Sequence, residues 1–85
     1  MSQIFAGPYS LLKKSATSAS LITLCIMENN HISERFYKNG NLINQVSSQH
    51  NGLAFAIEAA AKRLEYLMQY EQYCPQDPIS VTSLQ

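Results

Sequence analysis

This 85-residue chain contains four cysteine and histidine residues, whose thiol and imidazole groups are the usual ligands of structural zinc: Cys25, His31, His50 and Cys74. Two thiolates and two imidazoles are enough for a tetrahedral structural zinc site. The spacing does not follow the CxxC or HxxxH patterns typical of such sites. Cys25 also falls within the apolar run LITLCIME, where a cysteine acts as a small hydrophobic residue. We therefore predict no metal site and no bound cofactor.

Candidates for acid–base or nucleophilic chemistry are equally sparse. Asp77 is the only aspartate and lies in a proline-containing C-terminal segment, so a Ser-His-Asp triad would require that segment to fold back. Cys74 and His50 lie at opposite ends of a predicted helix about 30 Å long, too far apart for a nucleophile and its base. Glu34 is the only carboxylate that the predicted register places among apolar neighbours, but a strand edge facing solvent is the simpler interpretation. We predict no catalytic residue and no enzyme activity.

The element around which the chain is organised is a helix over residues 52–73, GLAFAIEAAAKRLEYLMQYEQY. At about 100° per residue, one face is an apolar stripe expected to pack on a sheet. This stripe contains Ile57, Ala61, Leu64 and Met68, flanked by Leu53, Ala60 and Leu67. The roughly opposite face is rich in aromatic residues, which a helix covering one sheet does not need. We predict that this face is an interface formed by Phe55, Ala59, Lys62, Arg63, Tyr66, Tyr70 and Tyr73. The alternative is that these aromatic residues cover the N-terminal segment or the tail of the same subunit.

Three strands are predicted before the helix, over residues 21–28, 31–38 and 41–47. Asn29-Asn30 suits a tight turn, and Asn39-Gly40 is a strong signal for a type I′ hairpin. The expected fold is therefore α+β: a three-stranded antiparallel β-meander packed by one long C-terminal α-helix.

Two-residue turns at both places determine the strand register. The resulting pairs are Tyr37 with Leu42, Ser33 with Val46, and Leu24 with Arg35. This register mixes apolar and polar side chains on both faces of the sheet. Either the register is wrong by one residue, which exchanges the two faces, or both faces are covered.

The ends of the chain are assigned separately from the core domain of residues 21–74. Residues 1–20 are predicted to form a short N-terminal helix starting near Pro8, or an extended arm anchored by Ile4 and Phe5. Residues 75–85, PQDPISVTSLQ, are predicted to be a disordered tail.

Composition limits the possible partners. The net charge is zero, with six basic and six acidic residues, which argues against a protein that neutralises many phosphates. We see neither a signal peptide nor an apolar run long enough to span a membrane, and two cysteines do not form a disulfide framework. The chain is therefore expected to be cytoplasmic. We predict a non-enzymatic protein-binding module that binds itself as a homodimer, another protein, or both. The alternative is a nucleic-acid-binding protein that uses the Tyr, Arg and Lys side chains of the helix.

Three strands followed by an alanine-rich helix loosely resemble the second half of a double-stranded-RNA-binding domain. The same order is similar to the truncated ribonuclease-H-like fold of some small antitoxins. Neither resemblance covers the whole chain, and HNGLA stands where the RNA-binding helix begins with a basic GKK-like cluster. In size and neutrality the chain also looks like small inhibitors encoded by phages or mobile elements. That resemblance implies an accessory protein or an inhibitor that caps the surface of a partner protein.

Overall fold

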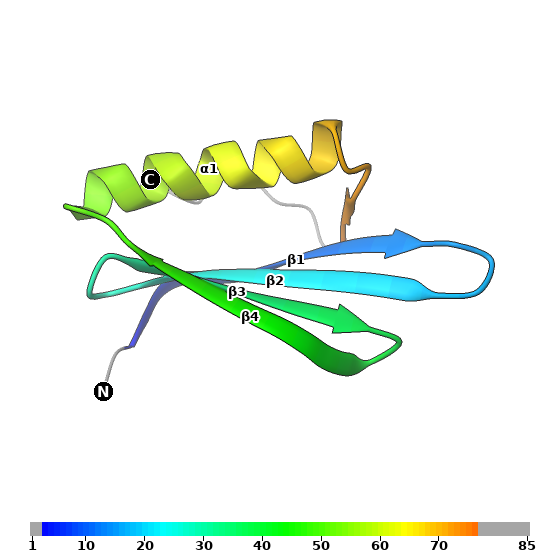
Figure 1. The fold of residues 1–85 in the computed structure, drawn as a ribbon. Helices are drawn as coiled ribbons and strands as arrows, with labels where there is room; N and C mark the ends of the chain where they lie inside the picture. Colours follow the sequence, from blue (N-terminus) through cyan, green and yellow to red (C-terminus); the bar gives the residue numbers. More distant parts are fainter. Residues whose placement is uncertain (1–2, 77–85) are drawn as a thin grey trace.

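The computed structural model describes residues 3–76 and shows one antiparallel sheet with one helix packed on one of its faces (Figure 1). The elements are β1 (Ile4–Lys14), β2 (Ala19–Met27), β3 (His31–Lys38), β4 (Asn41–Gln49), α1 (Leu53–Gln69) and β5 (Cys74–Pro75). Across the sheet the strands follow the order β4-β3-β2-β1-β5. The α+β class is confirmed. The prediction of a three-stranded sheet is wrong, because residues 3–76 form a sheet of five strands.

The N-terminal segment accounts for most of this difference. The short helix is absent; the segment is extended, and it pairs with β2 from Ile4 opposite Met27 to Lys14 opposite Ala19. Leu11, in the middle of β1, is completely buried and belongs to the core. Ile4 and Phe5 are exposed, so they do not anchor the segment.

The β3–β4 hairpin has the predicted turn. Asn39 and Gly40 both have positive φ, at 52° and 85°, as a type I′ turn requires. Tyr37 pairs with Leu42, as predicted. A bulge follows between Phe36 and Tyr37, so that Phe36 pairs with Asn44. Beyond the bulge, Ser33 faces Ser47 instead of the predicted Val46.

The β2–β3 turn differs from the prediction by one residue. Asn30 has a φ of 66°, and its N–H donates to the carbonyl oxygen of Met27 at 3.1 Å. Three residues therefore separate the strands, and Leu24 pairs with Glu34 instead of Arg35. This shift exchanges the two faces of β3 relative to β2. The predicted register is therefore wrong by one residue, which explains why it mixed apolar and polar side chains on both faces of the sheet.

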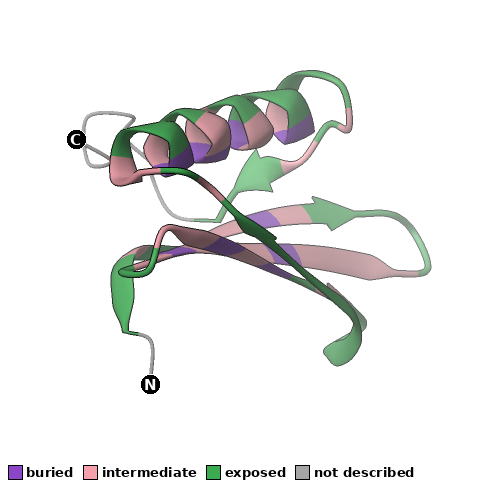
Figure 2. Cartoon of the chain, turned by 60° about the vertical axis from the view of Figure 1, so that its left-hand side comes forward, coloured by how far each residue is buried: buried purple, intermediate pink, exposed green. Residues whose placement is uncertain are grey.

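With the observed register, one face of the sheet is apolar and packs on α1 (Figure 2). The buried core combines Leu11, Ile22, Leu24, Ile26 and Ile32 of the sheet with Ala56, Ala60, Leu64 and Leu67 of the helix. Ile57, Ala61 and Met68 of the predicted stripe pack at its margin, half-buried. The buried face of α1 is therefore rotated about the helix axis relative to the prediction, so that it is centred on Ala56, Ala60, Leu64 and Leu67.

The helix ends earlier than predicted, at Gln69. Gln72 adopts a positive φ of 62°, and the Tyr73 N–H donates to the Leu67 carbonyl at 3.0 Å, which turns the chain back toward the sheet. Cys74 and Pro75 then pair with Leu12 and Leu11 of β1. The start of the predicted tail therefore belongs to the sheet, whereas residues 77–85 lie outside the described residues.

Candidate interaction surface

The helix carries an exposed aromatic flank, defined here as Phe55, Ala59, Tyr66 and Tyr70. The exposed fractions of Phe55, Tyr66 and Tyr70 are 62%, 44% and 71%. The ring centroids of Tyr66 and Tyr70 lie 5.3 Å apart, and the Arg63 guanidinium lies 5.7 Å from the Tyr66 centroid. Such ring and cation–π contacts hold large side chains in place before any partner arrives.

The structure keeps most of the predicted interface residues together, but not all. Ala59 is half-buried at the base of the flank. Lys62 pairs with Glu58 at 3.0 Å on the solvent side of the helix, where an ion pair contributes little. Tyr73 lies beyond the end of the helix, packs against the core, and has the Lys13 ammonium 5.4 Å from its ring centroid. Tyr73 is therefore separate from the aromatic flank.

The contact made by Arg63 shows toward which strands the aromatic flank is turned. Its Nε–H donates to Glu34 Oε1 at 2.9 Å, which links α1 to β3. Glu34 is buried, so the predicted strand edge facing solvent is wrong: the observed register places this carboxylate under the helix. The side of α1 that carries Arg63, Tyr66 and Tyr70 therefore faces the β3–β4 side of the sheet.

A groove lies on that side, between α1 and β4. Its volume is about 200 Å³, and it is lined by Ile32, Glu34, Phe36, Val46, Ser48 and Arg63. The groove exists because α1 packs over β2 and β3, and a helix about 10 Å wide covers only about two strands. The α1-facing side of β4 is consequently left uncovered.

Strand β4 was predicted as a strand, but its exposure is a feature that the sequence analysis missed. All nine of its residues are exposed, as the continuous green of β4 in Figure 2 shows. Leu42, Ile43 and Val46 are the large apolar residues among them. Among residues 3–76, no strand pairs with the outer edge of β4. The signal was present in the sequence NLINQVSSQ, which has neither a charge nor a proline to protect an edge strand.

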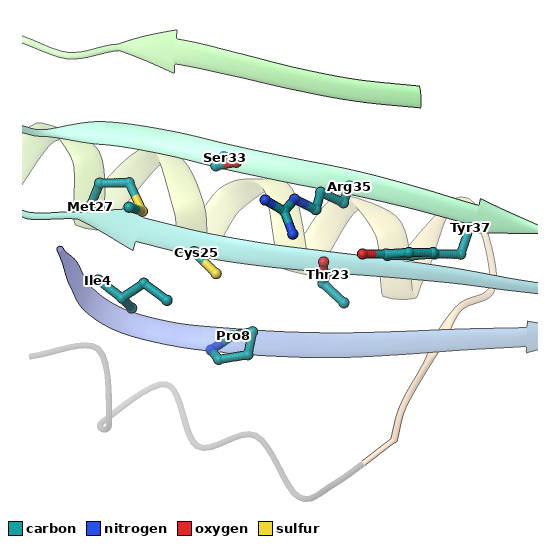
Figure 3. Close-up of a pocket in the computed structure, with 8 residues that line it drawn as sticks. All are labelled: Ile4, Pro8, Thr23, Cys25, Met27, Ser33, Arg35 and Tyr37. Carbon is teal, nitrogen blue, oxygen red and sulfur yellow. The ribbon is translucent and has the colours of Figure 1, made fainter. Parts of the chain in front are cut away.

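The sheet face opposite α1 holds a shallow pocket of about 300 Å³ (Figure 3). Its lining residues are Ile4, Pro8, Thr23, Cys25, Met27, Ser33, Arg35 and Tyr37. Burial raises the pKa of the Cys25 thiol above its ordinary value, and the charge of Arg35 offsets part of this effect. Cys25 therefore has less thiolate character than an ordinary exposed cysteine.

The four potential zinc ligands are not brought together. Among residues 3–76, no three His, Cys, Asp or Glu side chains form a group that could hold a metal ion. His50 Nε2 instead lies 3.0 Å from Ser48 Oγ at the end of β4. Asp77, the acid of the triad considered above, lies outside the described residues.

In the described part of the chain, α1 is too short and too polar to cross a membrane. Comparisons with protein-family models, curated proteins and solved structures found no match for this chain.

Proposed function

We propose that this protein is a non-enzymatic protein-binding module that forms a homodimer. It acts as a small accessory protein or as an inhibitor that caps the surface of a partner protein. The observation that supports this function best is the exposed aromatic flank of α1 beside the uncovered strand β4. A reducing compartment such as the cytoplasm suits the two free thiols, Cys25 and Cys74.

The chemistry of the flank suits association with a protein. Tyrosine offers a large contact area at a low cost in side-chain entropy and is enriched at interface hot spots. Tyr66 and Tyr70 already contact each other, so a partner would not need to order them. The total charge of zero also weakens the long-range repulsion between two copies.

Nucleic-acid binding through the same helix is the weaker candidate. Base stacking on Tyr66 or Tyr70 would need nearby cations for the phosphates. Arg63 is already paired with Glu34, and Lys62 with Glu58. The whole chain supplies no excess of positive charge.

The test is the oligomeric state of the full chain, measured by sedimentation velocity across a range of concentrations. We expect a reversible dimer for the wild type. Tyr66→Lys combined with Tyr70→Lys should raise the dissociation constant about tenfold or more, since two ammonium groups must then lose water without gaining partners. The far-UV circular dichroism should stay unchanged, because lysine is a good helix former and both positions are exposed.

The matched control is Ala54→Lys combined with Ala16→Lys. Ala54 on α1 and Ala16 in the β1–β2 turn are both exposed and do not belong to the aromatic flank, and the variant gains the same two charges. It should dimerise like the wild type. A wild type that stays monomeric at millimolar concentration would overturn the homodimer, and equal weakening by both variants would overturn the role of the flank.

A further inference from the structure

We infer that the homodimer forms by antiparallel pairing of β4 with β4 of a second copy, so that the two sheets join into one. This inference rests on the proposed homodimer and names the surface that makes it. Four observations support a second copy as the occupant: the contrast between the two edges of the sheet, the charge of β4, the position of the tyrosines and the available area.

The first observation is that the two edges of the sheet are treated differently. The β1 edge carries Pro8, Lys13 and Lys14, has irregular register near its start, and is partly covered by β5. These are the usual devices that prevent an edge strand from pairing with another chain. The β4 edge has one bulge near Ile43, contains no proline or lysine, and is paired with no other strand within residues 3–76. The chain therefore protects one edge and leaves the other able to pair.

The second observation is that β4 is compatible with itself. A two-fold axis between two copies of β4 brings each residue opposite another residue of the same strand. Like charges opposite each other would destabilise such a strand pair, but residues 41–49 contain no charged side chain. Asparagine, glutamine and serine side chains, which both donate and accept hydrogen bonds, occupy six of the nine positions. A strand of this composition can pair with its own copy without repulsion.

The third observation is where the tyrosines lie relative to the new seam. Residues paired across two strands lie on the same face of the sheet, and Ile32, Glu34 and Phe36 of β3 lie on the face that α1 covers. Their partners on β4 therefore also face α1: Asn44, Val46 and Ser48. Pairing these residues with the same set of the second copy keeps both helices on one side of the joined sheet. Helices centred over β2 and β3 would then lie about 19 Å apart, four strand spacings.

That separation leaves a gap of about 8 Å between two helices of ordinary diameter. Tyr66 and Tyr70 project from the side of α1 that faces the seam, and their long side chains can fill the gap above Val46. The same dimer thus covers the aromatic flank, the groove beside β4, and the β4 edge.

The fourth observation is that the surface is large enough. A nine-residue strand is about 30 Å long, and the wall formed by β4 and α1 is about 20 Å high. Its flat area is about 600 Å², and protruding side chains raise the accessible area. A stable interface needs about 800 Å² per partner, roughly one seventh of the 5666 Å² surface of this chain.

The test places lysines on β4 in the full chain, at Leu42→Lys and Ser47→Lys together. Both residues are exposed on the face opposite α1, and lysine is a residue that natural edge strands tolerate. In the paired dimer four added positive charges would lie along the seam, so we expect the dissociation constant to rise about tenfold or more. The control is Ala16→Lys with Thr17→Lys in the exposed β1–β2 turn, which should dimerise like the wild type.

Amide hydrogen exchange provides a second readout. In a free edge strand, alternate N–H groups of β4 point to solvent and exchange quickly. In the paired dimer these amides should become protected as the protein concentration rises, and the lysine variant should lose this protection.

The outcomes separate the inference from the proposed function. A wild-type dimer weakened by the tyrosine variant but not by the β4 lysines, with no protection of β4, would overturn β4 pairing and leave a dimer formed by the helices. Protection of β4 at every concentration in a monomeric protein would assign the edge to another segment of the same chain, and would overturn both proposals.

Discussion

Arg63 on α1 donates its Nε–H to Glu34 Oε1 on β3 at 2.9 Å, with exposed side-chain fractions of 37% and 12%. This ion pair is the polar link between the helix and the sheet among the described residues. It lies at the wall of the groove beside β4 and positions the guanidinium against the Tyr66 ring. The pair therefore connects the stability of the fold with the geometry of the aromatic flank.

Arg63→Met should lower the free energy of unfolding by about 1–3 kcal/mol, since it leaves the buried Glu34 carboxylate without its partner. Replacing both residues, with Glu34→Leu and Arg63→Met, should recover most of that loss, because no buried charge remains. Urea denaturation of the two single variants and the double variant measures this coupling. Additive losses would show that the pair does not act as a unit.

The glycines should differ in their tolerance of a side chain. At Gly7 the φ is +106° and an added Cβ would lie 2.8 Å from the Leu24 carbonyl oxygen, so Gly7→Ala forces backbone movement. At Gly40 the φ is +85° but the space is open, so Gly40→Ala should cost only about 1 kcal/mol of strain. Gly52→Ala meets ordinary contacts and should be nearly neutral. In thermal melts the loss of stability should be largest for the Gly7 variant, smaller for the Gly40 variant and smallest for the Gly52 variant. A Gly7 variant as stable as the Gly52 variant would contradict the β1–β2 packing.

The two thiols should react at different rates and with different pH dependence. Thiolate is the reactive form, and burial both raises the pKa of Cys25 and limits access to it, so at pH 8 the exposed Cys74 should be alkylated first. Cys25 should react as the pH rises through its folded pKa. Because burial raises that pKa, the contribution of the protonated thiol to stability is complete below the pKa of the unfolded chain and is lost as the pH rises through the folded pKa. Iodoacetamide labelling followed by mass spectrometry gives the order, and faster labelling of Cys25 would contradict its place in the sheet.

The sequence predicts local features of this fold better than those that depend on loop length or distant pairing. Asn39-Gly40 encodes its turn through two residues that tolerate positive φ, and Leu64 lies in the core as the helical period predicts. The β2–β3 register was missed because Asn30 alone adopts positive φ, which lengthens the loop by one residue. Strand β1 was missed because Tyr9, Leu11 and Leu12 suit a helix turn or a strand equally, and only pairing with β2 decides between them.

The candidate surface was predictable only in part. Phe55, Tyr66 and Tyr70 follow from the helical period and are exposed together. The position of Tyr73 was not predictable, because it depends on where the helix ends and how the chain returns to β1. The sequence NLINQVSSQ records only that this strand lacks a protecting charge or proline. That β4 is left uncovered depends on which strands lie beneath α1, which is a tertiary relationship.

A homodimer formed through β4 and the aromatic flank is tested most directly by isotope-filtered NMR on a mixture of labelled and unlabelled chains. We predict contacts between the copies that join β4 to β4 and Tyr66 or Tyr70 to the flank of the other helix. Contacts between copies confined to the sheet face around Cys25 and Arg35, or none at millimolar concentration, would contradict it.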